Sequence, residues 1–431
     1  MVNIKAFKAL RPRKDLVDKV AALPYDVLSR GEAKEEVKNN EFSFLNIDKA
    51  ETYFPENISE YSEEVYKKAG ENLEGFIQNN VFIKEEKDCL YVYELDLDGK
   101  AQRGIVSCLS VDDYLNNTIK KHEFTRSKKE EDRIKHIKAC NAQTGPIFLT
   151  YRDSEKISNI VSKIVLEKPL YDFISDDGVL HRVWKIDDKS IIDEIIKEFK
   201  EINSIYIADG HHRSEAAVKV CLERREKGEC LPEDECNYFL GVLFPKTELT
   251  IIDYNRVVKD LNGLSEEEFL LKLEEKFQIT KLNKEDNPKP KHKGEFGMYI
   301  NRDWFKLEYK EKNESSLIEK TKTDLVKNLD VSILQDNILE PILGIKDVRN
   351  DERIDFVGGI RGIKELERRV SEDMKVAFAL YPTSLEEVMK ISDKGLIMPP
   401  KSTWFEPKLR SGIFIQYKKG YYPKYNKTYF G

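Results

Sequence analysis

The sequence predicts a mixed α/β protein of the α+β kind, and three observations support this fold class. Strand-like and helix-like segments alternate along the 431 residues, without an internal repeat, a heptad run or a low-complexity tract. Apolar residues make up 40% of the chain and charged residues 35%, and the length suggests two or three domains with real cores. No apolar run approaches the ~20 residues of a membrane-spanning helix, so we expect a soluble globular protein.

Charge and cysteine usage narrow the classes of function. The formal net charge of −7 disfavours a general nucleic-acid binder, which depends on a surplus of Lys and Arg. The chain opens with Met-Val-Asn-Ile-Lys and lacks the pattern of a signal peptide, so we expect a cytoplasmic protein without a membrane partner. The six cysteines form no Cys-x-x-Cys pair, so we expect no zinc or disulfide framework and assign no metal ligand. The oligomeric state is not predicted.

The N-terminal region begins with a turn-bearing loop and continues into a helix and a hairpin. The loop carries Leu23-Pro-Tyr-Asp-Val27, where proline extends the residue before it and leaves Asp26 near a turn. Two later strands are joined by Asp98-Gly99, a dipeptide typical of tight hairpins. The predicted ranges are 60–78 for the helix and 89–97 and 104–111 for the strands.

A polar helix is predicted over residues 127–141. Its spacing places Arg133 and His136 on one face, where they would serve a common site, although a solvated mixed-charge helix is an equal alternative. His122 and Glu123 lie just before the helix, at an element boundary, where positioned side chains are often functional.

The segment 204–217 predicts a buried strand that passes through an Asp-Gly turn into a helix. The first amides of a helix have no intrahelical partner and the helix dipole adds positive potential, so this junction favours an anion. We expect the backbone N–H groups of Gly210, His211 and His212 to hold a phosphate that Arg213 grips in a bidentate fork. The alternative is an ordinary joint with a half-buried histidine pair.

The segment 284–294 has two prolines, many charges and little to bury, so it is predicted as a linker or loop between 1–283 and 295–431. Regular elements are expected on both sides of it. They are helices over 191–199 and over 323–343, the second disturbed at Pro341, strands over 238–244, 249–252 and 356–359, and a strand pair over 296–310.

A second unusual loop is Met398-Pro-Pro-Lys-Ser-Thr-Trp-Phe-Glu-Pro-Lys408, whose three prolines exclude a helix or central strand. Lys401 and Lys408 would reach phosphates from this stiff loop, and Ser402 and Thr403 would supply hydroxyl groups to a substrate. The alternative is a rigid strap that packs its two aromatic residues on the core.

Four segments together resemble the domain-of-unknown-function family 1015, and the resemblance spans essentially the whole chain. The Asp-Gly-His-His-Arg element is also similar to the phosphate-binding helix start of the ParB and sulfiredoxin-like superfamily. The segments are Leu23-Pro-Tyr-Asp-Val27, His122-Glu123, Ala208-Asp-Gly-His-His-Arg213 and the loop 398–408.

This resemblance implies a ParB/sulfiredoxin-like nucleotide-binding core with an additional α/β C-terminal region. The superfamily includes free-serine kinases, CTP-binding partition proteins and ATP-using sulfiredoxins, and an ATP-dependent L-serine kinase activity is associated with family 1015. His211 stands where the reactive cysteine of sulfiredoxins would align, which argues against sulfinic-acid chemistry. The chain also lacks a Walker P-loop.

The leading hypothesis is a cytoplasmic ATP-dependent kinase that converts L-serine to O-phosphoserine, with ATP or ADP as donor and Mg²⁺ on the phosphates. A carboxylate would accept the hydroxyl proton, although Asp209 is equally suited to cap the helix. The candidate catalytic residues are Asp26, Glu123, Asp209 and His211. The candidate nucleotide-binding residues are Gly210, His211, His212, Arg213, Lys401 and Lys408. The candidate substrate-binding residues are His122, Arg126, Ser402 and Thr403.

Two alternatives belong to other classes of protein. One is a nucleotide-dependent DNA-binding or regulatory protein of the ParB type, which would use the basic segment 120–138 as its contact surface, although no recognition helix stands out. The other is a non-catalytic nucleotide or metabolite sensor, because ligand pockets and active sites use the same residue types.

Overall fold

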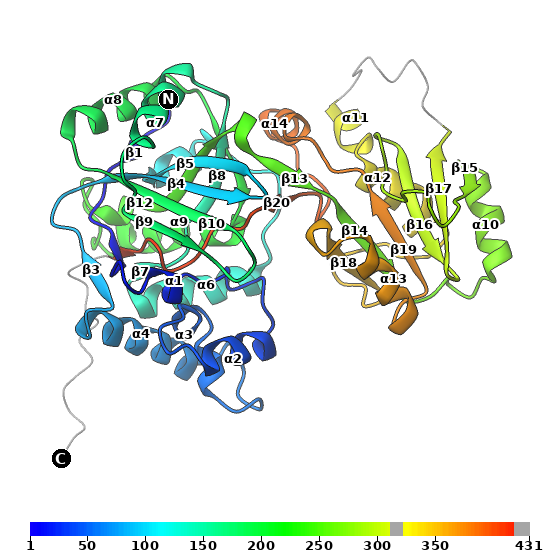
Figure 1. Ribbon diagram of the computed structural model, residues 1–431, viewed down its shortest axis with the longest axis horizontal. Coiled ribbons are helices and arrows are strands. Elements are labelled where there is room, and N and C mark those ends of the chain that lie inside the picture. Colours follow the sequence, from blue (N-terminus) through cyan, green and yellow to red (C-terminus); the bar gives the residue numbers. More distant parts are fainter. Residues whose placement is uncertain (311–321, 418–431) are drawn as a thin grey trace. The chain divides into compact units, whose positions relative to one another are not determined.

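The computed structural model describes residues 1–310 and 322–417, and it divides into two units (Figure 1). The first unit contains Met1–Lys120, Thr125–Leu249 and the segment from Pro407. The second contains Lys121–Phe124 and Thr250–Glu406. Each unit has a buried apolar core and its own sheet, which confirms the predicted mixed α/β class.

A nine-stranded mixed sheet forms the centre of the first unit, in the order β6-β11-β8-β12-β5-β4-β10-β9, with β1 also paired to β5. The pairs β6–β11 and β8–β12 are parallel, and the others are antiparallel. The strands are β1 (Ile4–Lys5), β4 (Leu90–Leu97), β5 (Lys100–Ser110), β6 (Ile119–Lys120), β8 (Ile147–Tyr151), β9 (Tyr171–Ile174), β10 (Leu180–Ile186), β11 (Ile205–Asp209) and β12 (Tyr238–Pro245).

The hairpin between β4 and β5 confirms the prediction made from Asp98-Gly99. Asp98 has φ 54° and Gly99 has φ 80°, the positive values that a two-residue hairpin turn requires at both central positions. Short polar or absent side chains tolerate this conformation, so the local sequence fixes where the chain reverses.

Helices surround this sheet, and the predicted helices at 60–78, 127–141 and 191–199 are confirmed as α4, α6 and α8. Helix α6 packs against both α4 and α9. The helices are α1 (Val17–Val20), α2 (Arg30–Lys38), α3 (Leu45–Asp48), α4 (Glu63–Gln78), α5 (Val111–Leu115), α6 (Ser127–Cys140), α7 (Glu155–Ile164), α8 (Lys189–Lys200) and α9 (His211–Glu226), with short 3₁₀ turns η1 (Ala50–Tyr53), η2 (Glu235–Asn237) and η3 (Lys246–Glu248).

Two short strand pairs complete the first unit. Strand β2 (Leu10–Pro12) pairs with β3 (Phe82–Lys84), and β7 (Ala142–Gln143) pairs with β21 (Gln416–Tyr417). The returning segment also bridges to the N-terminal region through Ile415, which pairs with Leu10. The chain therefore comes back to the first unit after the second unit has been formed.

The prediction that the chain has no disulfide framework needs one correction. Cys230 and Cys236 form a disulfide that joins the loop after α9 to η2. The spacing of six residues matches none of the patterns by which sequence reveals a cysteine framework, and only the loop geometry brings the two sulfurs together. Cys221 is a fully buried thiol within α9, as its helical position predicts.

The second unit is built on a six-stranded antiparallel sheet in the order β15-β17-β16-β19-β14-β18. A separate pair joins β13 to β20. The strands are β13 (Thr250–Ile252), β14 (Tyr254–Val258), β15 (Phe277–Lys281), β16 (Glu295–Ile300), β17 (Asp303–Tyr309), β18 (Ile354–Gly358), β19 (Val376–Leu380) and β20 (Trp404–Glu406); the helices are α10 (Glu266–Glu274), α11 (Lys322–Lys327), α12 (Asp330–Leu334), the π-helical η5 (Gln335–Leu339), the 3₁₀ turn η6 (Gly359–Arg361), α13 (Ile363–Glu372) and α14 (Leu385–Asp393).

The segment 284–294 connects β15 and β16, which belong to the same sheet, so it lies inside the second unit. The structure divides the chain at residues 249/250 and 406/407 instead of between 1–283 and 295–431. Prolines and charges mark an exposed connection, but they do not reveal whether it joins two units or two strands.

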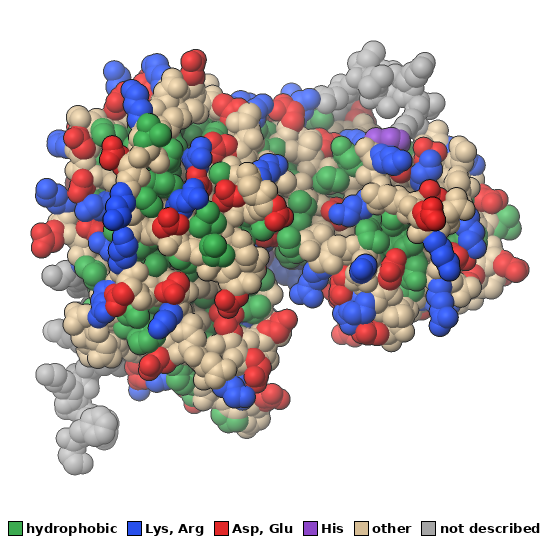
Figure 2. Space-filling model, in the orientation of Figure 1, with side chains coloured by type: hydrophobic (Ala, Val, Ile, Leu, Met, Phe, Trp, Pro, Cys, Tyr) green, Lys and Arg blue, Asp and Glu red, His purple; other side chains and the backbone are tan. Residues whose placement is uncertain are grey.

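The surface is mixed in charge. Figure 2 shows Lys and Arg side chains interspersed with Asp and Glu side chains on the visible face. None of the helices in the described part of the chain has the length and apolarity that a membrane crossing requires.

Candidate functional site

The candidate site is built at the junction between β11 and α9. Strand β11 is buried up to Ala208 and ends at Asp209, and Gly210 turns the chain with φ 94° and ψ 29° before α9 begins at His211. Gly210 is the N-cap and provides no side-chain hydrogen bond to the first turn, so Asp209 does not fill the capping role that was its alternative. The junction presents the positive end of a 16-residue helix to its surroundings.

Arg213 lies folded back onto this turn. Its side chain is buried, and one terminal nitrogen donates to the carbonyl oxygen of Pro146 at 2.6 Å. The Nε atom is buried without a hydrogen-bond partner. A Cβ atom added to Gly210 would lie 3.1 Å from Nε and 3.1 Å from Nη2 of Arg213. Because Gly210 has no side chain, the guanidinium of Arg213 can lie against the turn.

Two cations and one carboxylate meet at this junction. Lys408 Nζ lies 3.4 Å from Asp209 Oδ2, and Arg213 Nη2 lies 3.6 Å from the same oxygen. Burial raises the pKa of Asp209, but the charges of Lys408, Arg213 and His211 outweigh burial and hold that pKa well below its ordinary value. The three charged groups carry a net charge of +1 when the histidine is neutral, which adds to the helix dipole in favouring an anion.

One cavity adjoins the junction, and a second adjoins the first. The cavity that includes Arg213 and Gly145, here called the Arg213 cavity, is partly open to solvent and has about 380 Å³ of unoccupied space, the adjoining solvent included. The second, here called the Glu51 cavity, has about 390 Å³ of such space, and none of its lining residues belongs to the junction. Both are lined by Tyr25, Asp48, Arg133 and His136, so the two form adjoining parts of one hollow region in the first unit.

Buried ionisable side chains line this region, although such residues are rarely buried without a partner. Asp48 accepts a hydrogen bond from Thr144 Oγ1 at 2.8 Å, and its Oδ1 atom lies 3.7 Å from His136 Nε2. His136 Nε2 donates to the carbonyl oxygen of Ile47 at 3.1 Å. Burial lowers the pKa of His136, and the charge of Arg133 lowers it further, which keeps the imidazole neutral.

The Glu51 cavity has a second set of paired charges. Lys49 Nζ and Glu51 Oε1 form a buried ion pair at 2.9 Å. Arg133 Nε donates to Asp132 at 2.9 Å, and its guanidinium carbon lies 3.8 Å from the centre of the Tyr25 ring. Arg133 and His136 line the same two cavities from one face of α6, as their spacing predicts, and their service in one functional site stays a prediction.

The other predicted residues of the first unit lie around this region. Asp26 is exposed in the turn after Tyr25 and lines neither cavity. His211 is buried at the start of α9. His212 Nε2 accepts a hydrogen bond from the backbone amide of Arg126 at 3.1 Å, so the helix start and the segment before α6 are in contact.

The remaining predicted residues belong to the second unit, where they form a single loop region. The carbonyl oxygen of His122 accepts a hydrogen bond from the amide of Met398 at 2.8 Å, which places Glu123 beside the proline-rich loop. Ser402 Oγ donates to the carbonyl oxygen of Pro399 at 2.6 Å. The indole of Trp404 packs against Gly358 and lies 4.9 Å, centre to centre, from the ring of Tyr254.

Within that loop, Lys401 adopts φ 60° and its carbonyl oxygen accepts from Arg256 at 2.8 Å, while the carbonyl oxygen of Ser402 accepts from Thr383 at 2.9 Å. Thr403 follows, half-buried. These contacts show that the loop is fixed by its own unit. Roles for Lys401, Ser402 and Thr403 in ligand binding stay predictions.

Asp48, Lys49 and Glu51 line these cavities and are not among the residues predicted from the sequence. One sequence feature points to these three residues: they follow the apolar run that begins at Phe44. Ionisable residues next to an apolar run are either exposed to solvent or paired with one another in the interior. Nothing in the local sequence indicates that α6 closes over them.

The basic segment 120–138, the proposed DNA contact of the alternative hypothesis, is largely engaged within the protein. Lys135 pairs with Glu63 at 2.8 Å, Lys138 pairs with Glu223 at 2.5 Å, and Arg133 is buried.

The fold and the junction together define a class of mixed α/β protein in which a buried strand turns through glycine into the start of a helix, an arrangement that favours an anion. The chain belongs to the DUF1015 family of proteins of unknown function, whose family model matches residues 4–332. This confirms the family that the four sequence segments predicted. No curated protein matches the chain.

Several solved structures are similar to the chain at low identity. A free serine kinase in complex with AMP is 13% identical, with 72% of this chain and 91% of that chain covered and a TM-score of 0.34. A conserved hypothetical protein from Pyrococcus furiosus is 12% identical, with coverage of 72% and 95% and a TM-score of 0.34. SbnI with a C-terminal truncation, from Staphylococcus aureus, is 12% identical, with coverage of 72% and 87% and a TM-score of 0.36. These values are too low to transfer an activity.

Proposed function

We propose that this protein is an ATP-dependent kinase of a small hydroxyl compound, with L-serine as the acceptor. One observation carries the proposal: the buried guanidinium of Arg213 lies against Gly210 at the start of α9, with its Nε atom lacking a partner, and faces a cavity lined by ionisable groups. A positively charged helix start next to a polar cavity provides what phosphoryl transfer requires, namely charge neutralisation and position.

In this proposal the nucleotide phosphates bind at the first turn of α9. The backbone N–H groups of Gly210, His211 and His212 donate to phosphate oxygens, and Arg213 and Lys408 neutralise their charge. Mg²⁺ bound together with the nucleotide would offset the negative charge that develops on the phosphates during transfer. ADP in place of ATP as the donor is compatible with the same contacts.

The acceptor occupies the Arg213 cavity, and Asp48 is the proposed proton acceptor. Asp48 lines both cavities, whereas Asp26 lines neither and Asp209 is held by two cations that make it a poor base. The acceptor oxygen forms a bond to the terminal phosphorus as the bond to the bridging oxygen breaks. The hydroxyl proton passes to Asp48, and the shortened nucleotide leaves.

The paired charges of the adjoining cavity support an amino acid as the acceptor. A zwitterion needs a carboxylate near its ammonium group and a cation near its carboxylate, and this region offers Glu51 and Asp132 for the first and Arg133 for the second. L-Serine adds the hydroxyl group that receives the phosphoryl group.

The test is incubation of the purified chain with Mg²⁺, ATP or ADP, and a panel of small hydroxyl compounds, with the product identified by its mass. The panel pairs L-serine with L-alanine, which lacks the hydroxyl, and with D-serine, which reverses the positions of the charged groups. We expect O-phosphoserine from L-serine alone. Nucleotide binding without any phosphorylated product would identify a sensor, and salt-sensitive DNA binding would favour the regulatory alternative.

A further inference from the structure

A second cluster of chemically active side chains lies in the other unit, on the β16–β17 hairpin. Glu295 begins β16 and stands directly opposite Glu308 of β17 in the antiparallel register. The side chain of Glu295 is only 7% exposed and that of Glu308 is 33% exposed. Two carboxylates directly opposite each other repel, and burial strengthens the repulsion, so this pair requires a positive charge between its members.

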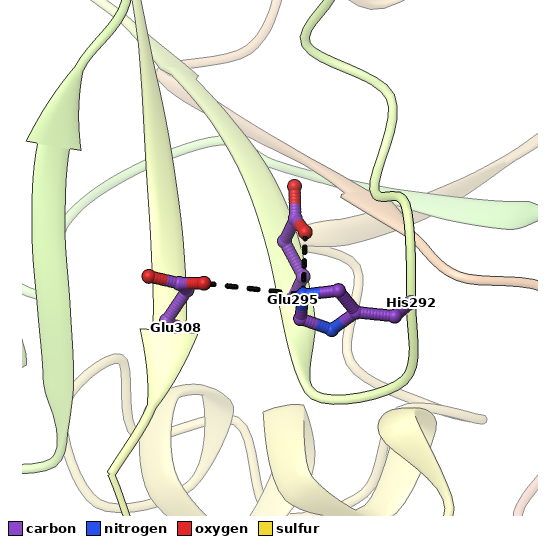
Figure 3. Close-up of side chains that lie close together, drawn as sticks. All are labelled: His292, Glu295 and Glu308. Carbon is purple, nitrogen blue, oxygen red and sulfur yellow. Dashed lines mark ion pairs between the residues drawn. The ribbon is translucent and has the colours of Figure 1, made fainter.

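His292 supplies the third group of this cluster. Its Nε2 atom lies 3.2 Å from Glu295 Oε2 and 3.9 Å from Glu308 Oε1. Figure 3 shows the imidazole ring directed toward both carboxylates from the connection that precedes β16. One ligand atom from each residue lies within 4.8 Å of the other two.

The other ring nitrogen shows how the imidazole is oriented. Nδ1 of His292 lies 3.2 Å from the carbonyl oxygen of Lys293. A carbonyl oxygen only accepts hydrogen bonds, so Nδ1 carries the proton. Nε2 is the ring nitrogen that faces the two carboxylates, and it is the nitrogen that would bind a metal ion between them.

The two nearby lysines pair with carboxylate oxygens other than those that face His292. Lys306 Nζ lies 3.5 Å from Oε2 of Glu308, the oxygen other than the one that faces His292. Lys293 forms an ion pair with Glu387. Neither lysine is paired with Glu295 by these contacts, and the side chain that lies against this most buried carboxylate of the cluster is that of His292.

We propose that His292 Nε2, Glu295 and Glu308 bind a divalent transition-metal ion, Zn²⁺ being the probe of choice. Atoms bound to tetrahedral Zn²⁺ at about 2.0–2.2 Å are separated by about 3.3–3.6 Å. His292 Nε2 lies 3.2 Å from Glu295 Oε2 and 3.9 Å from Glu308 Oε1, so small side-chain movements would bring the ligand atoms to these separations. One imidazole nitrogen and two carboxylate oxygens suit Zn²⁺ better than Mg²⁺, which prefers oxygen alone. Three protein ligands leave the fourth tetrahedral position open. Water reaches this position because the His292 side chain is half exposed. The ion would fasten the connection between β15 and β16 to the hairpin.

The test is titration of the EDTA-treated and desalted full chain with ZnCl₂, followed by calorimetry. His292→Gln and Glu308→Gln each remove one ligand, and Glu275→Gln removes an exposed glutamate of the same unit as a control. We expect the affinity for Zn²⁺ at this site to fall at least tenfold in the first two variants, so that one binding event disappears from their titrations. We expect the control to match the wild type.

Thermal unfolding supplies a second measurement that separates a metal site from a plain ion pair. If the three residues bind a metal ion, Zn²⁺ raises the midpoint of thermal unfolding of the wild type and not that of Glu308→Gln. In EDTA this variant unfolds at the same temperature as the wild type or a higher one, because the repulsion between the two carboxylates is gone. If His292 acts only as a charged partner, Zn²⁺ titrations of wild type and variants coincide and both variants are less stable in EDTA. That second pattern overturns the proposal.

Discussion

Replacement of Gly210 by alanine tests whether the junction binds phosphate through the position of Arg213. The added Cβ would lie 3.1 Å from both Nε and Nη2 of the guanidinium, tighter than an ordinary contact, so the guanidinium must shift by a few tenths of an ångström. A charged hydrogen bond that is lost contributes about 1.5–3 kcal/mol, and each ~1.4 kcal/mol changes affinity tenfold. We therefore expect nucleotide binding to weaken by about 10- to 100-fold.

The backbone effect of this substitution has a matched control on the same helix. Gly228 follows α9 with φ 70°, and a Cβ there meets nothing within 4 Å. Alanine at either position adopts a left-handed conformation, which costs about 1–2 kcal/mol of folding free energy. We expect both variants to lose similar stability in urea unfolding, and only Gly210→Ala to lose nucleotide affinity by calorimetry. Equal nucleotide affinity of the two variants would refute the assignment of the phosphate site.

Three further predictions follow from individual side chains. Asp48→Asn keeps the hydrogen-bond acceptor for Thr144 and removes the proposed base, so we expect turnover to fall by about 10²- to 10⁴-fold while nucleotide affinity stays unchanged; retained turnover in a product-mass assay would exclude Asp48. Lys408→Met keeps the aliphatic stem and removes one of the two cations beside Asp209, so nucleotide affinity measured at low salt should fall about tenfold with little change in the unfolding midpoint, and an unchanged affinity would place Lys408 outside the site. Burial and the charge of Arg410 lower the pKa of His181 to about 3 from an ordinary value of 6.5, so its contribution to stability is complete above pH 6.5 and is lost as the pH falls toward 3. His181→Gln should flatten the pH dependence of the unfolding free energy in that interval by up to ~1.4 kcal/mol per pH unit, and an identical slope in the two proteins would contradict the buried neutral histidine.

The elements that the sequence predicted are those with local causes. Asp98-Gly99 forms a hairpin turn because both residues accept positive φ. The apolar run before Asp209 forms the buried strand β11, which pairs with β6 on one side and with β8 on the other. The backbone of the proposed anion site was predictable for the same reason: a strand, a glycine and a helix start lie within one short segment. Lys408 was named as a candidate from chemistry alone, and its contact with Asp209 bridges 199 positions in the sequence.

The parts that were missed depend on contacts between distant segments. Asp48 and Glu51 belong to the cavity because α6 packs across them, and Cys230 meets Cys236 because of the path of a loop. The boundary near residue 284 was misplaced because composition marks an exposed connection without showing which strands it joins. His292 was counted as part of that connection, and the carboxylates that face it lie on strands whose register the sequence leaves open.

The return of the chain to the first unit has a consequence for biosynthesis. The second unit interrupts the first, and the segment from Pro407 completes the first unit by pairing β21 with β7 and by bringing Lys408 to Asp209. During translation the residues of the junction emerge long before that lysine does, so the site at Gly210 lacks one of its two cations until the second unit has been made. A chain that stops before residue 407 would thus carry the glycine turn and Arg213 without the second cation of the proposed anion site, and synthesis of the intervening unit would precede completion of that site.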